Sequence, residues 1–252
     1  MNREVRIGTC GLRSPRSKYY SSLDVVELQE TFYDLPDTDR LRRLRQEAPP
    51  SFEFTVKVFQ AITHPRTSPT WRRMRAKLPG NLDNYGYLRP TRENLEIWNV
   101  FLERTRPLSA RVYVFQTPSS MPATEEAFRW VLDFFKTIRQ RDIVVGWEPR
   151  GPWCEKREWL LKVVEECDIV HVVDPFRREP VKIKSVTYFR LHGIGGGETN
   201  YRYRYTDQDL LKLRELVLRC LQFSEKIYVL FDNIYMFEDA VRFRNLVRQP
   251  YR

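Results

Sequence analysis

Short apolar runs alternate along the chain with longer segments of helical period. The runs are rich in β-branched and aromatic residues and apolar at nearly every position, which is typical of parallel strands covered on both faces. Eight runs are predicted to be strands: 4–9, 25–28, 52–58, 112–116, 143–148, 169–174, 187–192 and 227–233. Six segments of helical period are predicted to be helices: 37–48, 93–104, 125–139, 156–166, 207–221 and 236–248.

This alternation predicts an α/β fold with a parallel sheet. Eight strands, each followed by a crossover, are the strand number of a single (β/α)8 barrel of the TIM type, and closure leaves no sheet edge exposed. The length of 252 residues suits one such domain, residues 1–252. Residues 63–90, which contain four prolines, interrupt the alternation. We expect them to form a long irregular loop excursion after the third strand.

Two helix starts carry capping signals. Thr124 precedes two glutamates, and Thr206 precedes Asp207. A threonine hydroxyl at such a position accepts a hydrogen bond from a free backbone N–H of the first turn. We therefore expect these two helices to begin directly after the threonines.

Composition and charge narrow the class of protein. Lys and Arg number 43 against 33 Asp and Glu, a net charge of +10, which favours anionic partners such as DNA or RNA. The alternative is a charged helix surface rich in ion pairs. No apolar run has the length of a membrane span and no secretory signal is visible, so we expect a cytoplasmic protein with no membrane partner. The four cysteines are widely spaced and predicted to be reduced and buried.

Polar and ionisable side chains stand at or near the carboxyl ends of the predicted strands. In a TIM-type barrel these ends surround the mouth at which chemistry occurs, so we expect these side chains to share one pocket. Charged groups brought together there shift one another's pKa values, as acid and base pairs require. The set is Glu27, Lys57, Gln116, Glu148, Arg150, Asp174, Arg190, His192, Asp232 and Asn233.

Four of these residues are candidates for catalysis. His192 is the first candidate for a general acid or base, because the pKa of a free histidine lies near neutrality; the alternative is a core histidine bonded to a carbonyl. Glu148 pairs with Lys57 or His192 in the functional interpretation and with Arg150 in the structural one. Lys57 lies among β-branched residues and must be paired or line a polar cavity. Glu27 completes the catalytic set.

The other two histidines and the glycine cluster are more ambiguous. His64, in ITHPR, suits a loop cap and a ligand-binding role equally, whereas His171 lies within a strand and is expected to be structural. The sequence GIGGGETNYRYRY lacks the closing residues of a P-loop. It suits a flexible loop whose Tyr203 clamps a base or a sugar, or alternatively an ordinary surface loop.

A divalent metal is a further candidate. The carboxylates and histidines near the strand ends supply enough ligands for Mg²⁺ or Mn²⁺, with Asp174 and Asp232 as the first choices. No local ligand motif of the HExxH kind fixes the geometry.

Six sequence blocks, in order along nearly the whole chain, resemble the YecE-like family, known as domain of unknown function 72 (DUF72). The blocks are ELQETFYDLP, FTVKVFQAITH, FQTPSS, VVGWEPRGPW, YFRLHG and VLFDN. The resemblance implies a TIM-barrel fold with a polar pocket at the strand ends, and no established reaction. It carries over as pocket residues Glu27, Tyr33, Lys57, His64, Gln116, Glu148, Arg150, Arg190, His192 and Asn233.

The chain departs from the family pattern at two positions. It has Asp232 before Asn233 where the family tends to have two asparagines, and Gln29 where the family often has asparagine. The additional acid favours a metal or altered acid-base roles.

Three functions fit these observations. The first is an enzyme acting on a phosphate-bearing substrate, as a phosphodiesterase or nuclease-like hydrolase. The second is a sugar or sugar-phosphate isomerase or hydrolase, with Glu27 and Glu148 as its carboxylate pair and Trp147 and Trp153 as stacking surfaces. The third is a non-catalytic nucleic-acid-binding protein that uses its arginine-rich segments.

Overall fold

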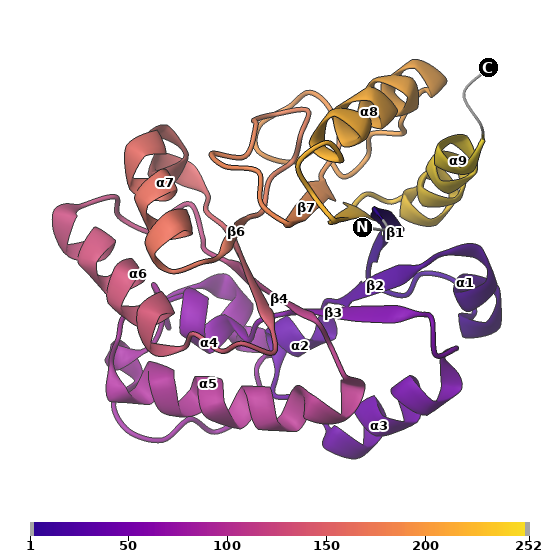
Figure 1. Ribbon diagram of the computed structural model, residues 1–252. Helices are drawn as coiled ribbons and strands as arrows, with labels where there is room; N and C mark the ends of the chain where they lie inside the picture. Colours follow the sequence, from indigo (N-terminus) through magenta and orange to yellow (C-terminus); the bar gives the residue numbers. More distant parts are fainter. Residues whose placement is uncertain (1–2, 250–252) are drawn as a thin grey trace. The chain divides into compact units, whose positions relative to one another are not determined.

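The computed structural model describes residues 3–249, and the chain divides into two compact units. Unit 1 comprises Met1–Glu27, Pro49–Glu53 and Val170–Arg252, and unit 2 comprises Leu28–Ala48 and Phe54–Ile169. Strands alternate with helices in both (Figure 1). The α/β order that the sequence predicts is therefore confirmed. That the chain forms a single domain stays a prediction.

Four parallel strands form the centre of unit 1. They lie in the order β2-β1-β8-β7. Because β1 pairs with both β2 and β8, the first and last strands are neighbours, which is the closure that a barrel requires. Their bounds are β1 (Glu4–Cys10), β2 (Val25–Leu28), β7 (Val186–Leu191) and β8 (Lys226–Phe231).

The sixth strand is shorter than expected. The sequence predicts residues 169–174, whereas β6 spans only Val170–His171, followed by a single bridge between Val173 and Phe189. Pro175 has no backbone N–H to continue the ladder. The Asp174 carboxylate instead accepts a hydrogen bond from the backbone N–H of Phe176 at 3.0 Å, which turns the chain.

Three helices belong to unit 1: α1 (Arg16–Ser22), α8 (Asp207–Cys220) and α9 (Met236–Arg248). Helix α8 begins directly after Thr206, as the sequence predicts, and Thr206 forms a capping box with Asp209. Helix α9 packs beside β1, β8 and α8 (Figure 1). Helix α1 was not predicted; its one buried residue, Tyr19, bonds through its hydroxyl to Thr9 and to the Val25 carbonyl. Tertiary contacts therefore support this short helix.

Unit 2 contains three further parallel strands and most of the helices. Strand β4 pairs with β3 and with β5. Helix α6 begins after Thr124, whose hydroxyl accepts from the Ala127 backbone N–H, as expected, and it lies against α7 (Figure 1). The bounds are β3 (Glu53–Lys57), β4 (Val112–Gln116), β5 (Val144–Glu148), α2 (Glu30–Tyr33), α3 (Thr38–Glu47), α4 (Gln60–Thr63), α5 (Arg92–Thr105), α6 (Glu125–Thr137) and α7 (Arg157–Glu166), with 3-10 turns η1 (Pro69–Arg73), η2 (Leu82–Asn84), η3 (Arg106–Leu108) and η4 (Gly151–Glu155).

Aromatic side chains fill the core of unit 2. Trp98, from α5, packs on Phe115, from β4, with ring centroids 5.1 Å apart, and Trp147, from β5, meets Trp153 at the same separation. All four are buried. Each such pair contributes about 0.5–1.5 kcal/mol beyond the burial of its area. These contacts fix β4 and β5, whose carboxyl ends carry candidate site residues.

Between α4 and α5 the chain forms turns and the two short helices η1 and η2. Tyr85 and Leu88 are buried in this segment. The side chain of Asn94 bonds to the backbone of Gly86 and Arg89, so it satisfies polar groups that a turn would otherwise leave unbonded. The segment is thus anchored to α5. Among residues 3–249, no helix is both long and apolar enough to cross a bilayer.

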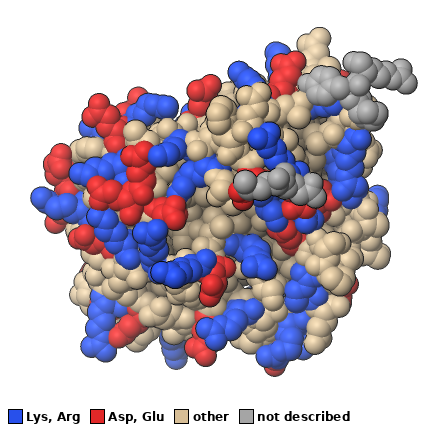
Figure 2. Space-filling model, viewed as in Figure 1, with Lys and Arg blue, Asp and Glu red and all other residues tan. Residues whose placement is uncertain are grey.

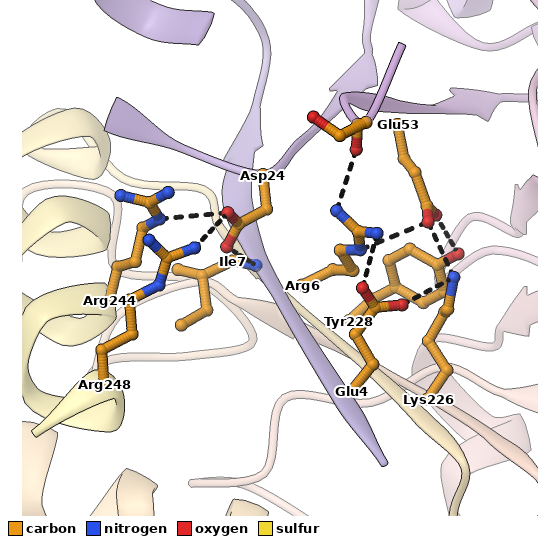
Figure 3. Close-up of polar contacts among 10 residues, drawn as sticks. Glu4, Arg6, Ile7, Asp24, Glu53, Lys226, Tyr228, Arg244 and Arg248 are labelled. Atoms are coloured by element: carbon orange, nitrogen blue, oxygen red, sulfur yellow. Dashed lines mark hydrogen bonds and ion pairs between the residues drawn. The ribbon is translucent and has the colours of Figure 1, made fainter. Parts of the chain in front are cut away.

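An ion network occupies the amino ends of the strands in unit 1 (Figure 3). Glu53 binds Lys226 at 2.7 Å and Arg6 at 3.2 Å, and it accepts a hydrogen bond from the hydroxyl of Tyr228. Burial by itself would raise the pKa of Glu53. The hydrogen bonds from Lys226 and Tyr228, together with the positive charges of Lys226 and Arg6, lower it below its usual value. Glu53 is therefore ionised in the folded protein at neutral pH.

A second carboxylate joins α9 to β1. Asp24 is nearly buried and accepts from Arg244 at 3.1 Å, from Arg248 at 2.8 Å and from the backbone N–H of Ile7 at 3.3 Å (Figure 3). Removing the charge of Asp24 would leave Arg244, which is 17% exposed, largely desolvated and without its counter-ion. Arg248 is 56% exposed and would remain hydrated. Asp24 should therefore contribute more to the free energy of unfolding than an exposed ion pair does.

We predict that Asp24→Asn lowers the free energy of unfolding by about 1–3 kcal/mol, because Arg244, which is 17% exposed, loses its counter-ion, whereas Arg248, which is 56% exposed, stays hydrated. Asp39→Asn is the matched control, since Asp39 pairs with Arg42 on the exposed surface of α3 and should cost less than about 1 kcal/mol. Urea unfolding followed by circular dichroism measures both. Equal losses in the two variants would contradict this account of the network.

Candidate functional site

The alternation of β7 brings three polar side chains to one face in unit 1. Tyr188, Arg190 and His192 stand two residues apart, and successive side chains of a strand point to opposite faces. Tyr188 and Arg190 are fully buried, and His192 is 3% exposed. Polar groups so deeply buried require partners within the protein.

Arg190 lies between two carboxylates. Its terminal nitrogen Nη2 is 3.0 Å from Oε1 of Glu27, at the end of β2, and 3.3 Å from Oδ2 of Asp232, directly after β8. The hydroxyl of Tyr188 donates to the other oxygen of Glu27 at 2.8 Å. The side chains of Arg190 and Glu27 are both completely buried. Arg190 is therefore held as the counter-ion of two acids.

Asp232 also faces His192. The ring nitrogen Nδ1 of His192 lies 3.2 Å from Oδ2 of Asp232, the oxygen that Arg190 contacts. Asp232 is 18% exposed and thus lies at the more open side of the cluster. The ring of Tyr201 meets the imidazole edge-to-face at 6.2 Å. Glu27, Arg190, Asp232 and His192 form a continuous chain of ionisable groups, which we call the β7 cluster.

The backbone around His192 is fixed by Asp174. Its carboxylate accepts from the backbone N–H of His192 at 2.8 Å. Burial raises the pKa of Asp174, and this hydrogen bond partly offsets that effect. Gly193 follows with a φ of 86° and lies so close to the Asn200 carbonyl that a side chain would collide with it. The position of His192 is therefore tightly determined.

The tyrosine-rich segment after the glycines is mainly structural. The hydroxyl of Tyr205 accepts from the Gly193 backbone N–H, and that of Tyr203 donates to Asp209. The side chain of Asn233 donates to the carbonyl of Tyr203 and to Asp239. Tyr203 and Asn233 thus have structural bonds, and their binding of a substrate stays a prediction.

Unit 2 holds a second group of candidates, around the end of β3. Lys57 is 9% exposed, and its ammonium lies 4.3 Å from the centre of the Phe32 ring. His64 directly follows α4, which begins at Gln60. Its ring nitrogen Nδ1 shares a hydrogen bond of 2.8 Å with the hydroxyl of Thr63. Burial, and next the charges of Lys57 and Arg150, lower the pKa of His64 to about 3. His64 is therefore neutral at physiological pH and sits in a positive potential.

Glu148, the last residue of β5, is bound by Arg150. Nε and Nη2 of Arg150 donate to one oxygen of Glu148 at 3.0 and 2.9 Å. The side chains are 8% and 18% exposed, so the pair is largely desolvated. The ion pair between Glu148 and Arg150, which we expected if Glu148 has a structural role, is therefore present. A catalytic role for Glu148 stays a prediction.

The last two candidates of unit 2 lie on other elements. Gln116 ends β4 and is 8% exposed. Tyr33 ends α2, and the guanidinium of Arg73 lies over its ring at 3.6 Å. In sum, unit 2 holds Tyr33, Lys57, His64, Gln116, Glu148 and Arg150, and unit 1 holds Glu27, Asp174, Arg190, His192, Tyr203, Asp232 and Asn233. The shared pocket stays a prediction.

Two residues that contact the β7 cluster, Tyr188 and Cys10, were not predicted from the sequence. Tyr188 could have been found from its period-two spacing with Arg190. Cys10 ends β1 and bonds to the side chain of Arg190, so the strand-end rule itself would have included it. Burial, and next the charge of Glu27, raise the pKa of Cys10 well above its usual value, which keeps the thiol protonated. The four cysteines are reduced as expected, although Cys154 is only half-buried.

The metal prediction concerns Asp174 and Asp232. Within residues 3–249, no three or more His, Cys, Asp or Glu side chains form a group that could hold a metal ion. Asp174 accepts two backbone hydrogen bonds, and Asp232 contacts Arg190 and His192. Asp174 also lies 3.6 Å from Nε of Arg177. Mg²⁺ or Mn²⁺ binding stays a prediction.

The fold matches those of solved structures over nearly the whole chain. A DUF72 family protein from Enterococcus faecalis V583 superposes with a TM-score of 0.74 at 20% identity, covering 99% of each chain. A DUF72 family protein from Thermotoga maritima MSB8 gives 0.73 at 21% identity, covering 98% of this chain and 100% of the other. A xylose isomerase domain containing protein from Salmonella typhimurium LT2 gives 0.59 at 14%, covering 99% and 100%.

These similarities confirm the fold class, an α/β barrel of the TIM type. No curated protein matches the chain. The model of the family described as "Protein of unknown function DUF72" matches residues 12–251. The resemblance seen in the sequence blocks is thereby confirmed, and the chain belongs to the DUF72 family.

Proposed function

We propose that the protein is an enzyme that transfers protons within a small phosphate-bearing substrate of the sugar-phosphate class, with His192 as the general acid and base. The observation that carries this proposal is the contact between Nδ1 of His192 and Asp232 at 3.2 Å. A carboxylate at Nδ1 favours the tautomer whose proton is on that nitrogen. Nε2 then has the lone pair that accepts a proton from a substrate.

In this mechanism Asp232 orients the imidazole ring of His192 and compensates the positive charge of its protonated form. A buried imidazolium is costly, and an adjacent carboxylate stabilises it when His192 takes up a proton. Arg190 holds Asp232 at 3.3 Å, and Glu27 balances the charge of Arg190. Arg190 is therefore a positioning residue, because both carboxylates already engage its guanidinium.

Unit 2, taken by itself, has charges that suit an anion. The pKa of His64 is depressed by burial and then by Lys57 and Arg150, so the space around its ring has a positive potential. Lys57, the last residue of β3, has an ammonium group of the kind that binds phosphate. The net charge of +10 also draws anions towards the protein.

The choice of a sugar has fold-level support, because the Salmonella protein of similar fold is named for a xylose isomerase domain. The choice of proton transfer rests on the pairing of His192 with Asp232. Hydrolysis of a phosphodiester, as by a nuclease, is the alternative outcome. It would use the same general base to activate water.

We predict that Lys57→Met raises the pKa of His64 from about 3 towards its unperturbed value, because one of the two cations that oppose protonation is lost. Burial remains, so the rise is partial. An NMR titration of the histidine ring measures it, with Lys77→Met, an exposed lysine of the same unit, as control. Inorganic phosphate should raise the pKa in the wild type and not in Lys57→Met; a phosphate effect that survives the substitution argues against this anion site.

The sign of the pH effect on stability follows from the same shift. Because the folded-state pKa of His64 lies below the unfolded value of about 6.5, the unfolded chain binds more protons between about pH 6.5 and 3. Stability is therefore lost as the pH falls through that window. We expect His64→Gln to flatten the decline, measured by urea unfolding at pH 7 and pH 5. An unchanged slope would contradict the low pKa.

We predict that the wild-type protein exchanges carbon-bound hydrogen of an aldose or ketose phosphate with deuterium from D₂O, as seen by proton NMR. His192→Gln should slow the exchange by about 10²–10⁴-fold, because the general base is lost. His171→Gln is the matched control: His171 accepts from the backbone N–H of Val181 and is structural, so exchange should persist. Exchange that survives in His192→Gln, or none with any sugar phosphate, speaks against the proposal. Cleavage of labelled oligonucleotides dependent on His192 would instead favour the hydrolase.

A further inference from the structure

One stretch of unit 2 has an unusual charge pattern. Residues 54–82 contain no Asp or Glu, yet they hold six cations: Lys57, Arg66, Arg72, Arg73, Arg75 and Lys77. Over α6 and α7, in contrast, basic and acidic side chains are interspersed, as on an ordinary solvated surface (Figure 2). We call residues 66–77, which carry five of the cations, the basic segment. All five of these side chains are exposed.

Most of these cations have no acidic partner. Arg66 pairs with Asp83 at 2.9 Å, and Arg73 lies over the ring of Tyr33. Across the part of the chain that the structure describes, no ion pair involves Arg72, Arg75 or Lys77. Such clustering of like charge is unfavourable for the isolated protein, and a polyanion relieves it.

The basic segment is anchored at two points by hydrogen bonds to the rest of unit 2. The indole nitrogen of Trp71 donates to the carbonyl of His64 at 3.1 Å, and the backbone N–H of Ala76 donates to the carboxylate of Asp34 at 2.9 Å. Between these anchors the turn η1 carries Arg72 and Arg73. The cations are thus presented from an anchored backbone, which lowers the entropic cost of binding.

We propose that the basic segment is a binding surface for the phosphodiester backbone of single-stranded nucleic acid. Four of its five cations are arginines, whose planar fork bonds two phosphate oxygens and stacks on bases. Tyr33 and Trp71, both half-buried, are aromatic side chains next to these arginines, a combination that suits unstacked bases. This surface is independent of the proton-transfer chemistry proposed above.

The chemistry of the basic segment argues against an anionic membrane as its partner. A membrane-binding surface combines cations with apolar side chains that insert into the lipid. Of the large apolar side chains that are exposed between residues 3 and 249, none lies within the basic segment. The charge is therefore presented without an apolar anchor.

The test compares two charge-reversal variants of equal net charge. Arg72→Glu/Arg75→Glu/Lys77→Glu alters the basic segment. Arg129→Glu/Arg141→Glu/Arg157→Glu alters three exposed arginines of the same unit, none of which has an ion pair among residues 3–249. Binding of fluorescein-labelled 20-nucleotide oligo(dT) and oligo(U) is followed by anisotropy from 50 to 300 mM salt. Circular dichroism and thermal unfolding confirm that both variants are folded.

We expect the wild type to bind both single strands, with affinity that falls steeply as salt rises. In the basic-segment variant, affinity at 50 mM salt should fall by about tenfold or more, and the slope of log K against log salt should decrease by about 2, for three lost phosphate contacts. The control variant should keep a slope close to that of the wild type. Equal losses in the two variants, stronger binding of a duplex of the same length, or no wild-type binding at 50 mM salt would each overturn the proposal.

Discussion

The arrangement of unit 1 depends on one buried cation, Arg190. Its guanidinium has no exposed surface and lies between Glu27 and Asp232. A buried charge of this kind is tolerable only when opposite charges and hydrogen bonds replace its water shell. Because the three groups come from β2, β7 and the residue after β8, their contact fixes the side chains at the carboxyl ends of these strands. Asp232 is thereby held next to the ring of His192.

The two ends of the strands in unit 1 have different chemistry. At the amino ends, Glu53 and Asp24 each hold two or more cations, and these networks tie β1, β8 and α9 together (Figure 3). At the carboxyl ends, the acids outnumber the cations around His192. In barrels of this type the first end serves stability and the second serves chemistry. The proposed function follows that division.

The sequence predicted the strands, the long helices and the starts of α6 and α8, because burial on both faces and threonine caps leave local signals. It did not predict α1, α2 or α4, which are seven residues or shorter and depend on tertiary contacts. Strand-end position identified Glu27, Arg190, His192 and Asp232. Their partners could not be predicted: Tyr188 and Glu27 bond across 161 positions, and spacing alone does not say which ends meet. The contacts of Arg190 with Glu27 and Asp232 likewise became visible only in the structure.

The proposed mechanism requires that Asp232 favours the tautomer of neutral His192 whose proton is on Nδ1. The nitrogen-15 NMR signals of the His192 ring, recorded at a pH where the ring is neutral, report the position of this proton. We expect it on Nδ1 in the wild type, and we expect Asp232→Ala to shift the equilibrium towards the Nε2-protonated form. A wild-type ring that is already protonated on Nε2, or one that is unaffected by loss of the carboxylate, would contradict it.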